Sequence, residues 1–122
     1  MAGYPLVIVS DAIFSPGRCL RELLDGAGML EYFDHCVFSD EVGRSKPHPA
    51  MFEAAARGVR CAVSDLVHIG DRPHNDVRGP HALGARAVLL TVVKDRGAAD
   101  SGADAVCDDY TKLPGILADL NG

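Results

Sequence analysis

An apolar run that ends in Gly-Asp, with a second carboxylate soon after it, constrains the fold of this 122-residue chain most strongly. Leu66 to Ile69 has the character of a buried strand, Gly70-Asp71 ends it, and Asp76 follows at the start of an expected helix. Ligands of open α/β sheets bind at the carboxyl ends of strands, and paired carboxylates there suit a hard cation. The stretch therefore predicts a cation site at one strand end of a parallel sheet.

Strand-like and helix-like segments alternate along the whole chain. The expected strands cover residues 6–9, 36–38, 66–70, 87–90 and 105–106, and the expected helices begin at Ser15-Pro16, Pro49, Asn75 and Thr111. Their inward faces are Cys19, Leu20, Leu23 and Leu24 in the first, Phe52, Ala55 and Ala56 in the second, and Leu113, Ile116, Leu117 and Leu120 in the last. Glycines end the first three helices at Gly26 and Gly28, Gly58 and Gly84, and Pro80 is expected to distort the third. The alternation predicts an α/β fold with a mainly parallel sheet, in one domain over residues 1–122.

Composition excludes several classes of partner. The net charge of −5 without a Lys/Arg cluster argues against nucleic acid and anionic membranes, which both require a concentrated basic face. The sequence has no apolar run near the roughly 18 residues of a membrane span, and its start lacks the charged region of a signal peptide. We therefore expect a cytoplasmic protein with no membrane and no nucleic-acid partner.

Five polar residues lie at the ends of expected strands or in the segments that follow them. They are Ser10 with Asp11, Lys46, Asp71 and Asp76. A hydroxyl, a fixed ammonium and paired carboxylates with a cation are the groups that hold a phosphoryl group, and Mg²⁺ suits one or two carboxylates with several waters. Pro47 and Pro49 flank His48 and stiffen the loop that presents Lys46.

These residues resemble the motifs of the haloacid dehalogenase superfamily, a group dominated by magnesium-dependent phosphatases. The strand ending in Ser10 is similar to its second motif, Lys46 in G-R-S-K-P-H-P to its third, and I-G-D-R-P-H-N-D-V to its fourth. The resemblance implies a Rossmann-like three-layer sandwich. It also implies that Ser10 and the Asp11 N–H bind the phosphoryl group, that Lys46 neutralises charge, and that Asp71 and Asp76 bind Mg²⁺.

Each residue also has a plain structural interpretation. Ser10 suits a strand-end turn, Lys46 a solvated surface, and Asp76 a helix N-terminus, where the macrodipole favours an acid. Asn75 suits a helix cap.

The first motif of the family, an apolar strand ending in D-x-D, does not occur in this sequence. By the resemblance the chain is similar to the C-terminal half of such an enzyme, without the central first strand and the cap domain. The strands ending at Ser10 and Asp71 would then have open edges, and open edges invite another chain. We expect the two strands to pair with each other, or a second copy or a separate partner chain to fill the gap. Association is the outcome we favour.

Four functions stay open. The first is a magnesium-dependent phosphatase-like hydrolase of a small phosphorylated metabolite, active only if a partner or an N-terminal segment supplies the nucleophilic Asp. The second is an inactive relative with a binding or assembly role. The third is a dehalogenase-like hydrolase with Asp11 as nucleophile, although Ile13 stands where the second Asp of the motif would be. A receiver-like phosphate sensor is a further alternative, for which Ser10-Asp11 supplies only one of two required acids.

Overall fold

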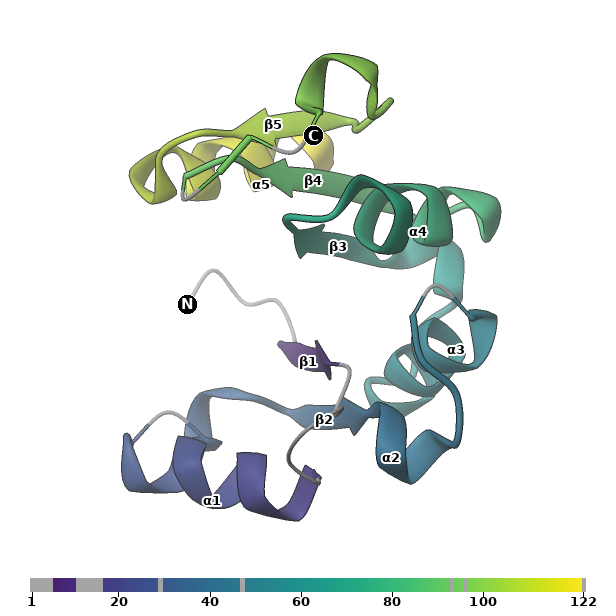
Figure 1. Cartoon of the computed structure of the whole chain (residues 1–122), viewed down its shortest axis with the longest axis vertical. Helices are drawn as coiled ribbons and strands as arrows, with labels where there is room; N and C mark the ends of the chain where they lie inside the picture. The colour runs from purple at the N-terminus through teal and green to yellow at the C-terminus, as the bar shows by residue number, and fades with distance from the viewer. Residues whose placement is uncertain are drawn as a thin grey trace. The chain divides into compact units, whose positions relative to one another are not determined.

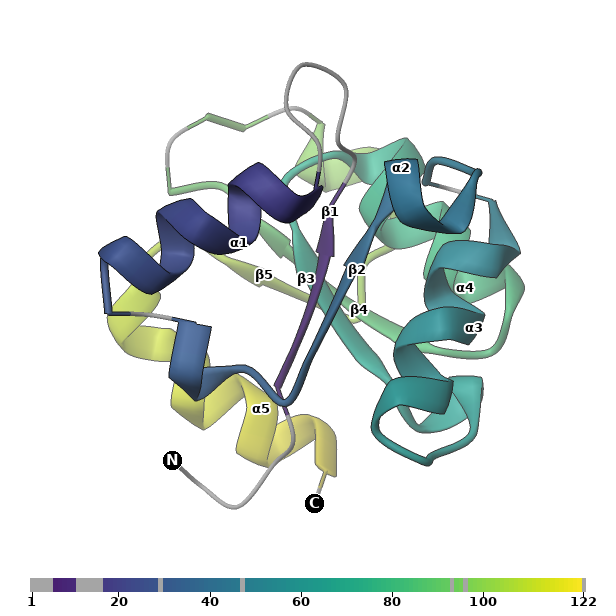
Figure 2. The ribbon, with the colours of Figure 1, turned by 90° about the horizontal axis from the view of Figure 1, so that it is seen from below.

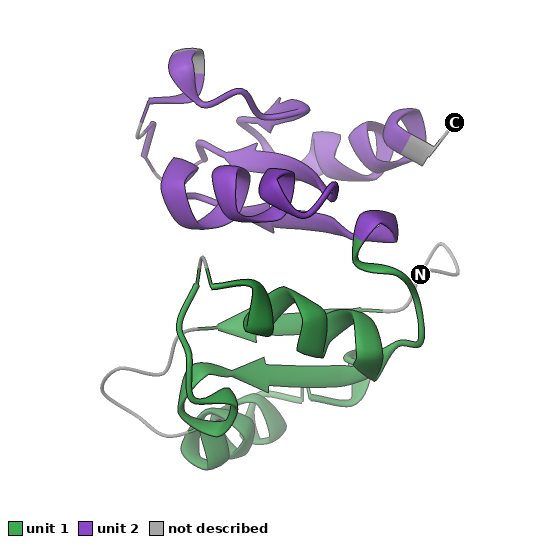
Figure 3. Ribbon diagram, turned by 90° about the vertical axis from the view of Figure 1, so that its right-hand side faces the viewer, with its two compact units in different colours: residues 1–63 green, residues 64–122 purple. Residues whose placement is uncertain are grey.

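The protein is described from a computed structural model (Figure 1). The structure describes residues 6–10, 17–28, 30–46, 48–92, 94–95 and 97–121, so Asp11 and the expected cap at Ser15-Pro16 lie outside the described residues. The chain divides into two compact units, residues 1–63 and 64–122, which Figure 3 shows in two colours. Each unit contains its own parallel sheet and is described by itself.

The first unit contains a two-stranded sheet, seen in Figure 2 as β1 beside β2. β1 (Val7–Ser10) pairs with β2 (His35–Phe38) in parallel, with Val7 beside His35 and Ser10 beside Phe38. Its helical segments are α1 (Gly17–Gly26), the 3-10 turn η1 (Leu30–Tyr32), α2 (Ser39–Val42) and α3 (Pro49–Gly58). Both predicted strands are present, each within one residue of its expected bounds.

Helix α3 follows the prediction closely. Phe52, Ala55 and Ala56 are buried as expected, together with Met51, and the helix packs on β1 and β2. Pro49 occupies the first turn, where its missing N–H is least costly. His48 caps the helix, because its Nδ1 accepts a hydrogen bond of 3.1 Å from the Ala50 N–H.

The predicted apolar face of helix α1 is only partly covered. Leu23, expected to point inward, is 68% exposed, so its placement was wrong, whereas Cys19, Leu20 and Leu24 are half-buried. Gly17 and Arg21 make the contacts with β2 and α2. A Cβ on Gly17 would lie 2.7 Å from a Phe38 ring atom, and the Arg21 guanidinium lies 4.9 Å from the centre of the same ring and binds Glu41.

The second unit contains a three-stranded parallel sheet in the order β3-β4-β5. The strands are β3 (Val67–Gly70), β4 (Arg86–Leu90) and β5 (Ala105–Cys107), close to the predicted ranges. The remaining segments are η2 (Val63–Asp65), η3 (Pro73–Arg78), α4 (Gly79–Ala82), η4 (Ala98–Asp100), η5 (Tyr110–Lys112) and α5 (Leu113–Asn121). Val77 of η3 packs with Ala87 and Leu89 of β4 in the buried core of this unit.

The helical segment after β3 begins earlier than predicted and opens with a π-helical turn. It starts at Pro73, with Arg72 at the cap position, so the expected role of Asn75 as the cap is wrong. The Gly79 N–H bonds to the His74 carbonyl five residues back, and Pro80 follows without an N–H. We attribute the wide turn to Pro80, whose ring would clash with the carbonyl four residues earlier in a regular α-helix. The expected distortion is therefore present, and Gly84 ends the segment with φ +81°.

The last helix is capped by a different residue from the one expected. Asp109 Oδ1 accepts hydrogen bonds from the Thr111 N–H (2.9 Å) and from the Thr111 hydroxyl (2.8 Å). Asp109, and not Thr111, therefore caps the turn that leads into α5. In the described ranges, no helix has both the length and the apolar composition that a bilayer crossing requires.

Candidate metal and phosphate site

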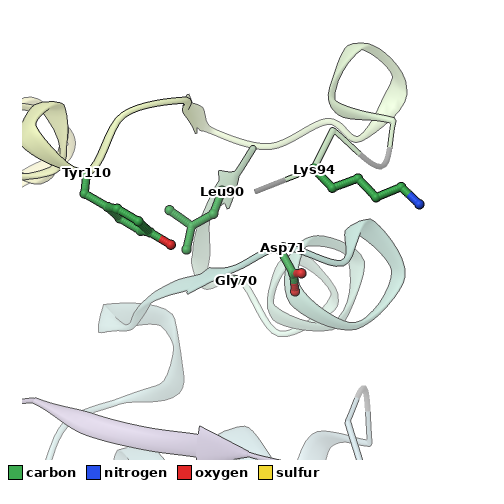
Figure 4. A pocket seen from close by; sticks show the side chains of 5 residues that line it. All are labelled: Gly70, Asp71, Leu90, Lys94 and Tyr110. Atoms are coloured by element: carbon green, nitrogen blue, oxygen red, sulfur yellow. The ribbon is translucent and has the colours of Figure 1, made fainter. Parts of the chain in front are cut away.

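Asp71 stands directly after β3 at its carboxyl end. Its side chain is exposed, whereas the four residues of β3 are half-buried. Figure 4 shows Asp71 beside Gly70, with Leu90 of the neighbouring strand nearby. Asp71 thus lies where open α/β sheets bind ligands, and its role as a ligand-binding carboxylate stays a prediction.

Asp76, in contrast, is only 2% exposed. Its Oδ1 lies 2.8 Å from His68 Nε2, and its Oδ2 accepts a hydrogen bond of 3.0 Å from the Arg72 N–H. The second bond ties the Asp76 carboxylate to the peptide that joins Asp71 to Arg72. The two predicted metal ligands therefore lie at the same end of β3.

Gly70 leaves the space that the Asp76 carboxylate occupies. A Cβ built on Gly70 would overlap Asp76 Cγ and Oδ2. The φ angle of Gly70 is not in the left-handed region, so space and not backbone conformation is what glycine provides here. The carboxylate of Asp76 thus packs against Gly70, and the carboxylate of Asp71 is exposed to solvent.

A shallow hollow lies beside Asp71 within the second unit (Figure 4). It has a volume of about 160 Å³ and is lined by Gly70, Asp71, Leu90, Lys94 and Tyr110. Tyr110 is 56% exposed. The hollow can take a few water molecules or a small group held by Asp71.

The donor set of this strand end fits magnesium better than a transition metal. In the described part of the chain no group of three His, Cys, Asp or Glu side chains could enclose a metal ion. Mg²⁺ does not require one, since it keeps several waters and binds through one or two carboxylates and substrate phosphates. Asp71 and Asp76, with the cradle at Gly70, are compatible with that mode.

Ser10 and Lys46 lie in the first unit. Ser10 is the last residue of β1 and is half-buried. Lys46, also half-buried, lies in a turn closed by a 2.9 Å hydrogen bond from the His48 N–H to the Ser45 carbonyl. Ser10 therefore lies at a strand end, and Lys46 lies in a hydrogen-bonded turn.

Comparison with models of protein families shows to which family the chain belongs. Residues 1–84 match the model of a family of hydrolases described as haloacid dehalogenase-like hydrolase. The chain belongs to the haloacid dehalogenase-like hydrolases. The predicted resemblance is confirmed.

Relatives of this haloacid dehalogenase-like chain include phosphatases. A glyceraldehyde 3-phosphate phosphatase of Methanothermobacter thermautotrophicus is 33% identical over 120 residues, which cover 94% of this chain and 52% of the relative. A phosphoserine phosphatase of Thermus thermophilus is 40% identical over 77 residues, which cover 63% and 29%. The chain thus spans about half of the first relative and less than a third of the second.

A solved structure shares the fold. The crystal structure of a HAD phosphatase from Thermococcus onnurineus superposes with a TM-score of 0.81 at 31% identity, covering 94% of this chain and 51% of that one. The α/β Rossmann-like fold class predicted from the sequence is therefore confirmed.

Sequence reasoning missed His68, which contacts Asp76. A histidine inside an apolar run reads as an ordinary core residue. One signal was available: in a strand, residues two apart share a face, so His68 lies on the same side of β3 as Gly70. That is the side on which the Asp76 carboxylate packs.

Proposed function

We propose that this chain forms the metal- and phosphate-binding part of a magnesium-dependent phosphomonoester hydrolase, acting on a small phosphorylated metabolite. The observation that carries the proposal is the pair at the end of β3. Asp71 is exposed, and the buried carboxylate of Asp76 is bonded to the peptide that follows Asp71. The phosphatases among the relatives support the same reaction class.

In this proposal Asp71 binds Mg²⁺ directly. Asp76 acts through a coordinated water, because it is 2% exposed and both of its oxygens accept hydrogen bonds from the chain itself. When bound, Mg²⁺ supplies the positive charge that neutralises the phosphoryl oxygens.

The residues of the first unit hold the phosphoryl group. Ser10 donates a hydrogen bond from its hydroxyl to a phosphoryl oxygen, and the backbone N–H of Asp11 donates another. Lys46 neutralises the charge that the nucleophile and the phosphoryl group share. Positioning and charge neutralisation supply most of the catalysis in phosphoryl transfer. In this proposal the attacking carboxylate and the acid that protonates the leaving oxygen both come from elsewhere.

The attacking carboxylate comes, in this proposal, from a strand outside the 122 residues, whether in a longer form of the protein or in a partner. β1 and β3 each have a strand neighbour on one side only among the described strands, and both have half-buried side chains throughout. Strands with open edges accept a further strand through main-chain hydrogen bonds. A strand ending in an Asp beside Asp71 would complete the reacting groups.

The test is hydrolysis of a generic aryl phosphate by this chain with and without a complementing segment. The complement is the part of the Methanothermobacter thermautotrophicus relative that lies outside the 120 matched residues. We expect turnover that requires both chains and Mg²⁺ and that falls at least about a hundredfold in Lys46→Ala, the scale of losing one charge-stabilising group. Lys112→Ala is the matched control, since Lys112 pairs with Asp108 at the surface.

Absence of turnover in the mixture, with both chains folded and associated, would contradict the catalytic proposal. Magnesium binding without turnover under those conditions would favour a binding role instead.

A further inference from the structure

His68 and Asp76 form a buried pair beside the candidate metal site. Their side chains are 11% and 3% exposed, and His68 Nε2 lies 2.8 Å from Asp76 Oδ1. A buried carboxylate that loses a hydrogen-bond donor pays a large desolvation cost, so such a contact fixes orientation strongly.

The contact bears on the tautomer of the imidazole. An ionised carboxylate can only accept hydrogen bonds, so an ionised Asp76 requires the proton on His68 Nε2. The Arg72 N–H donates to the other oxygen of the same carboxylate at 3.0 Å. Asp76 is thus held between a strand side chain and the loop backbone.

The hydrogen bond to Arg72 connects the His68–Asp76 pair to the backbone of Asp71. The Arg72 N–H belongs to the peptide that begins at the Asp71 carbonyl, and the carboxylate that binds it packs over Gly70. We propose that His68 is a positioning residue of this site: it holds the Asp76 carboxylate against the Arg72 N–H and thereby fixes the backbone that presents Asp71. The consequence for Mg²⁺ rests on the proposed function, whereas the effect on Arg72 does not.

The test uses the ¹⁵N-labelled chain and three variants. His68→Gln keeps an N–H donor near the position of Nε2, and His68→Leu keeps bulk but has no donor. His81→Leu is the control, because His81 Nε2 lies 2.7 Å from Asp104 Oδ2 in a more exposed histidine-carboxylate pair of the same unit. It removes a histidine-carboxylate contact that does not involve Asp76.

The first readout needs no metal. Hydrogen exchange at the Arg72 amide should accelerate about tenfold in His68→Leu, the factor that loss of one ordinary hydrogen bond corresponds to. His68→Gln and His81→Leu should stay within about threefold of the wild type. Long-range ¹H–¹⁵N correlation should place a proton on Nε2 of His68 in the wild type.

The second readout is Mg²⁺ affinity, followed by the amide shifts of Asp71 and Arg72. We expect His68→Leu to bind about 10- to 100-fold more weakly, the usual effect of removing a group that orients a metal ligand. His68→Gln should stay close to the wild type.

Several outcomes would overturn the inference. They are an unchanged Arg72 exchange rate in folded His68→Leu, a bare Nε2 on His68, or loss of Arg72 protection in folded His68→Gln. If the wild type takes up no Mg²⁺, the proposed function fails while the exchange and tautomer results still decide the role of His68. If His68→Leu does not fold, His68→Gln decides it.

Discussion

At the scale of single residues, the two carboxylates at the end of β3 have different surroundings. Asp71 is exposed after the strand, and Asp76 is buried with both oxygens bonded. An exposed carboxylate can be replaced at small cost to stability, whereas a buried and bonded one cannot.

The contrast predicts different results for two amide variants. Asp71→Asn should change the free energy of unfolding by less than about 0.5 kcal/mol, because its side chain is exposed. Asp76→Asn should lower it by about 1–3 kcal/mol, because an amide cannot accept from both His68 and the Arg72 N–H. Urea unfolding of both variants measures this, and equal losses would contradict the assignment.

Gly70 offers a second test at the same scale. Gly70→Ala should destabilise the protein by about 1–3 kcal/mol, because the added methyl group overlaps the Asp76 carboxylate. Gly115→Ala in α5 is the control, since nothing lies within 4 Å of its Cβ position and alanine favours a helix. Thermal unfolding should show a lower midpoint for the first variant and an unchanged or higher one for the second; the reverse order would count against the packing described at β3.

At the scale of elements, β4 and β5 are joined by a side-chain contact as well as by the ladder. Asp104 Oδ2 accepts a hydrogen bond of 2.7 Å from the Ala87 N–H and lies 2.7 Å from His81 Nε2. Burial tends to raise the pKa of this carboxyl, but the hydrogen bonds from His81 and from the Ala87 N–H outweigh it, and the net pKa of Asp104 is lowered. The ionised form therefore stabilises the folded unit.

The lowered pKa fixes the sign of a pH dependence. Because the folded state holds the Asp104 proton less tightly than the unfolded state, its contribution is present above about pH 4 and is lost as pH falls through the folded pKa. Asp104→Asn should cost about 1 kcal/mol at pH 7 and much less at pH 3. Urea unfolding at both pH values tests this, with Asp119→Asn as an exposed control; an equal cost at both values would refute it.

Elements whose orientation follows from their own sequence were predicted well, and elements whose orientation depends on contacts with other elements were not. The face of α3 follows from its own apolar pattern, so Phe52, Ala55 and Ala56 were placed correctly. How much of the apolar face of α1 is covered depends on contacts with other elements, such as that of Arg21 with Glu41, which periodicity cannot reveal, so Leu23 was misplaced. The start of the helix after β3 depends on a π turn linked to Pro80.

The same distinction holds for the residues of the candidate site. Motif spacing placed Asp71 and Asp76 at the same strand end, because the order of strand, loop and helix determines where they lie. It did not reveal the contact of His68 with Asp76, which depends on which face of β3 the following helix covers. The roles of Ser10, Asp11, Lys46, Asp71 and Asp76 stay predictions.

At the scale of the whole molecule, the chain is a partial representative of its family. It matches about half the length of the archaeal phosphatase and of the Thermococcus onnurineus structure. Its two compact units each hold a parallel sheet with an edge strand, β1 and β3. Association with a further strand and the single domain over residues 1–122 both stay predictions.

The central claim is that the end of β3 is a magnesium site. The most direct measurement is a Mg²⁺ titration of the ¹⁵N-labelled chain, followed by its amide spectra, with Asp71→Asn and the exposed control Asp119→Asn. We expect saturable shifts centred on residues 70–76 in the wild type and in Asp119→Asn, and at least about tenfold weaker binding in Asp71→Asn. Shifts that do not saturate, or that persist unchanged in Asp71→Asn, would contradict it.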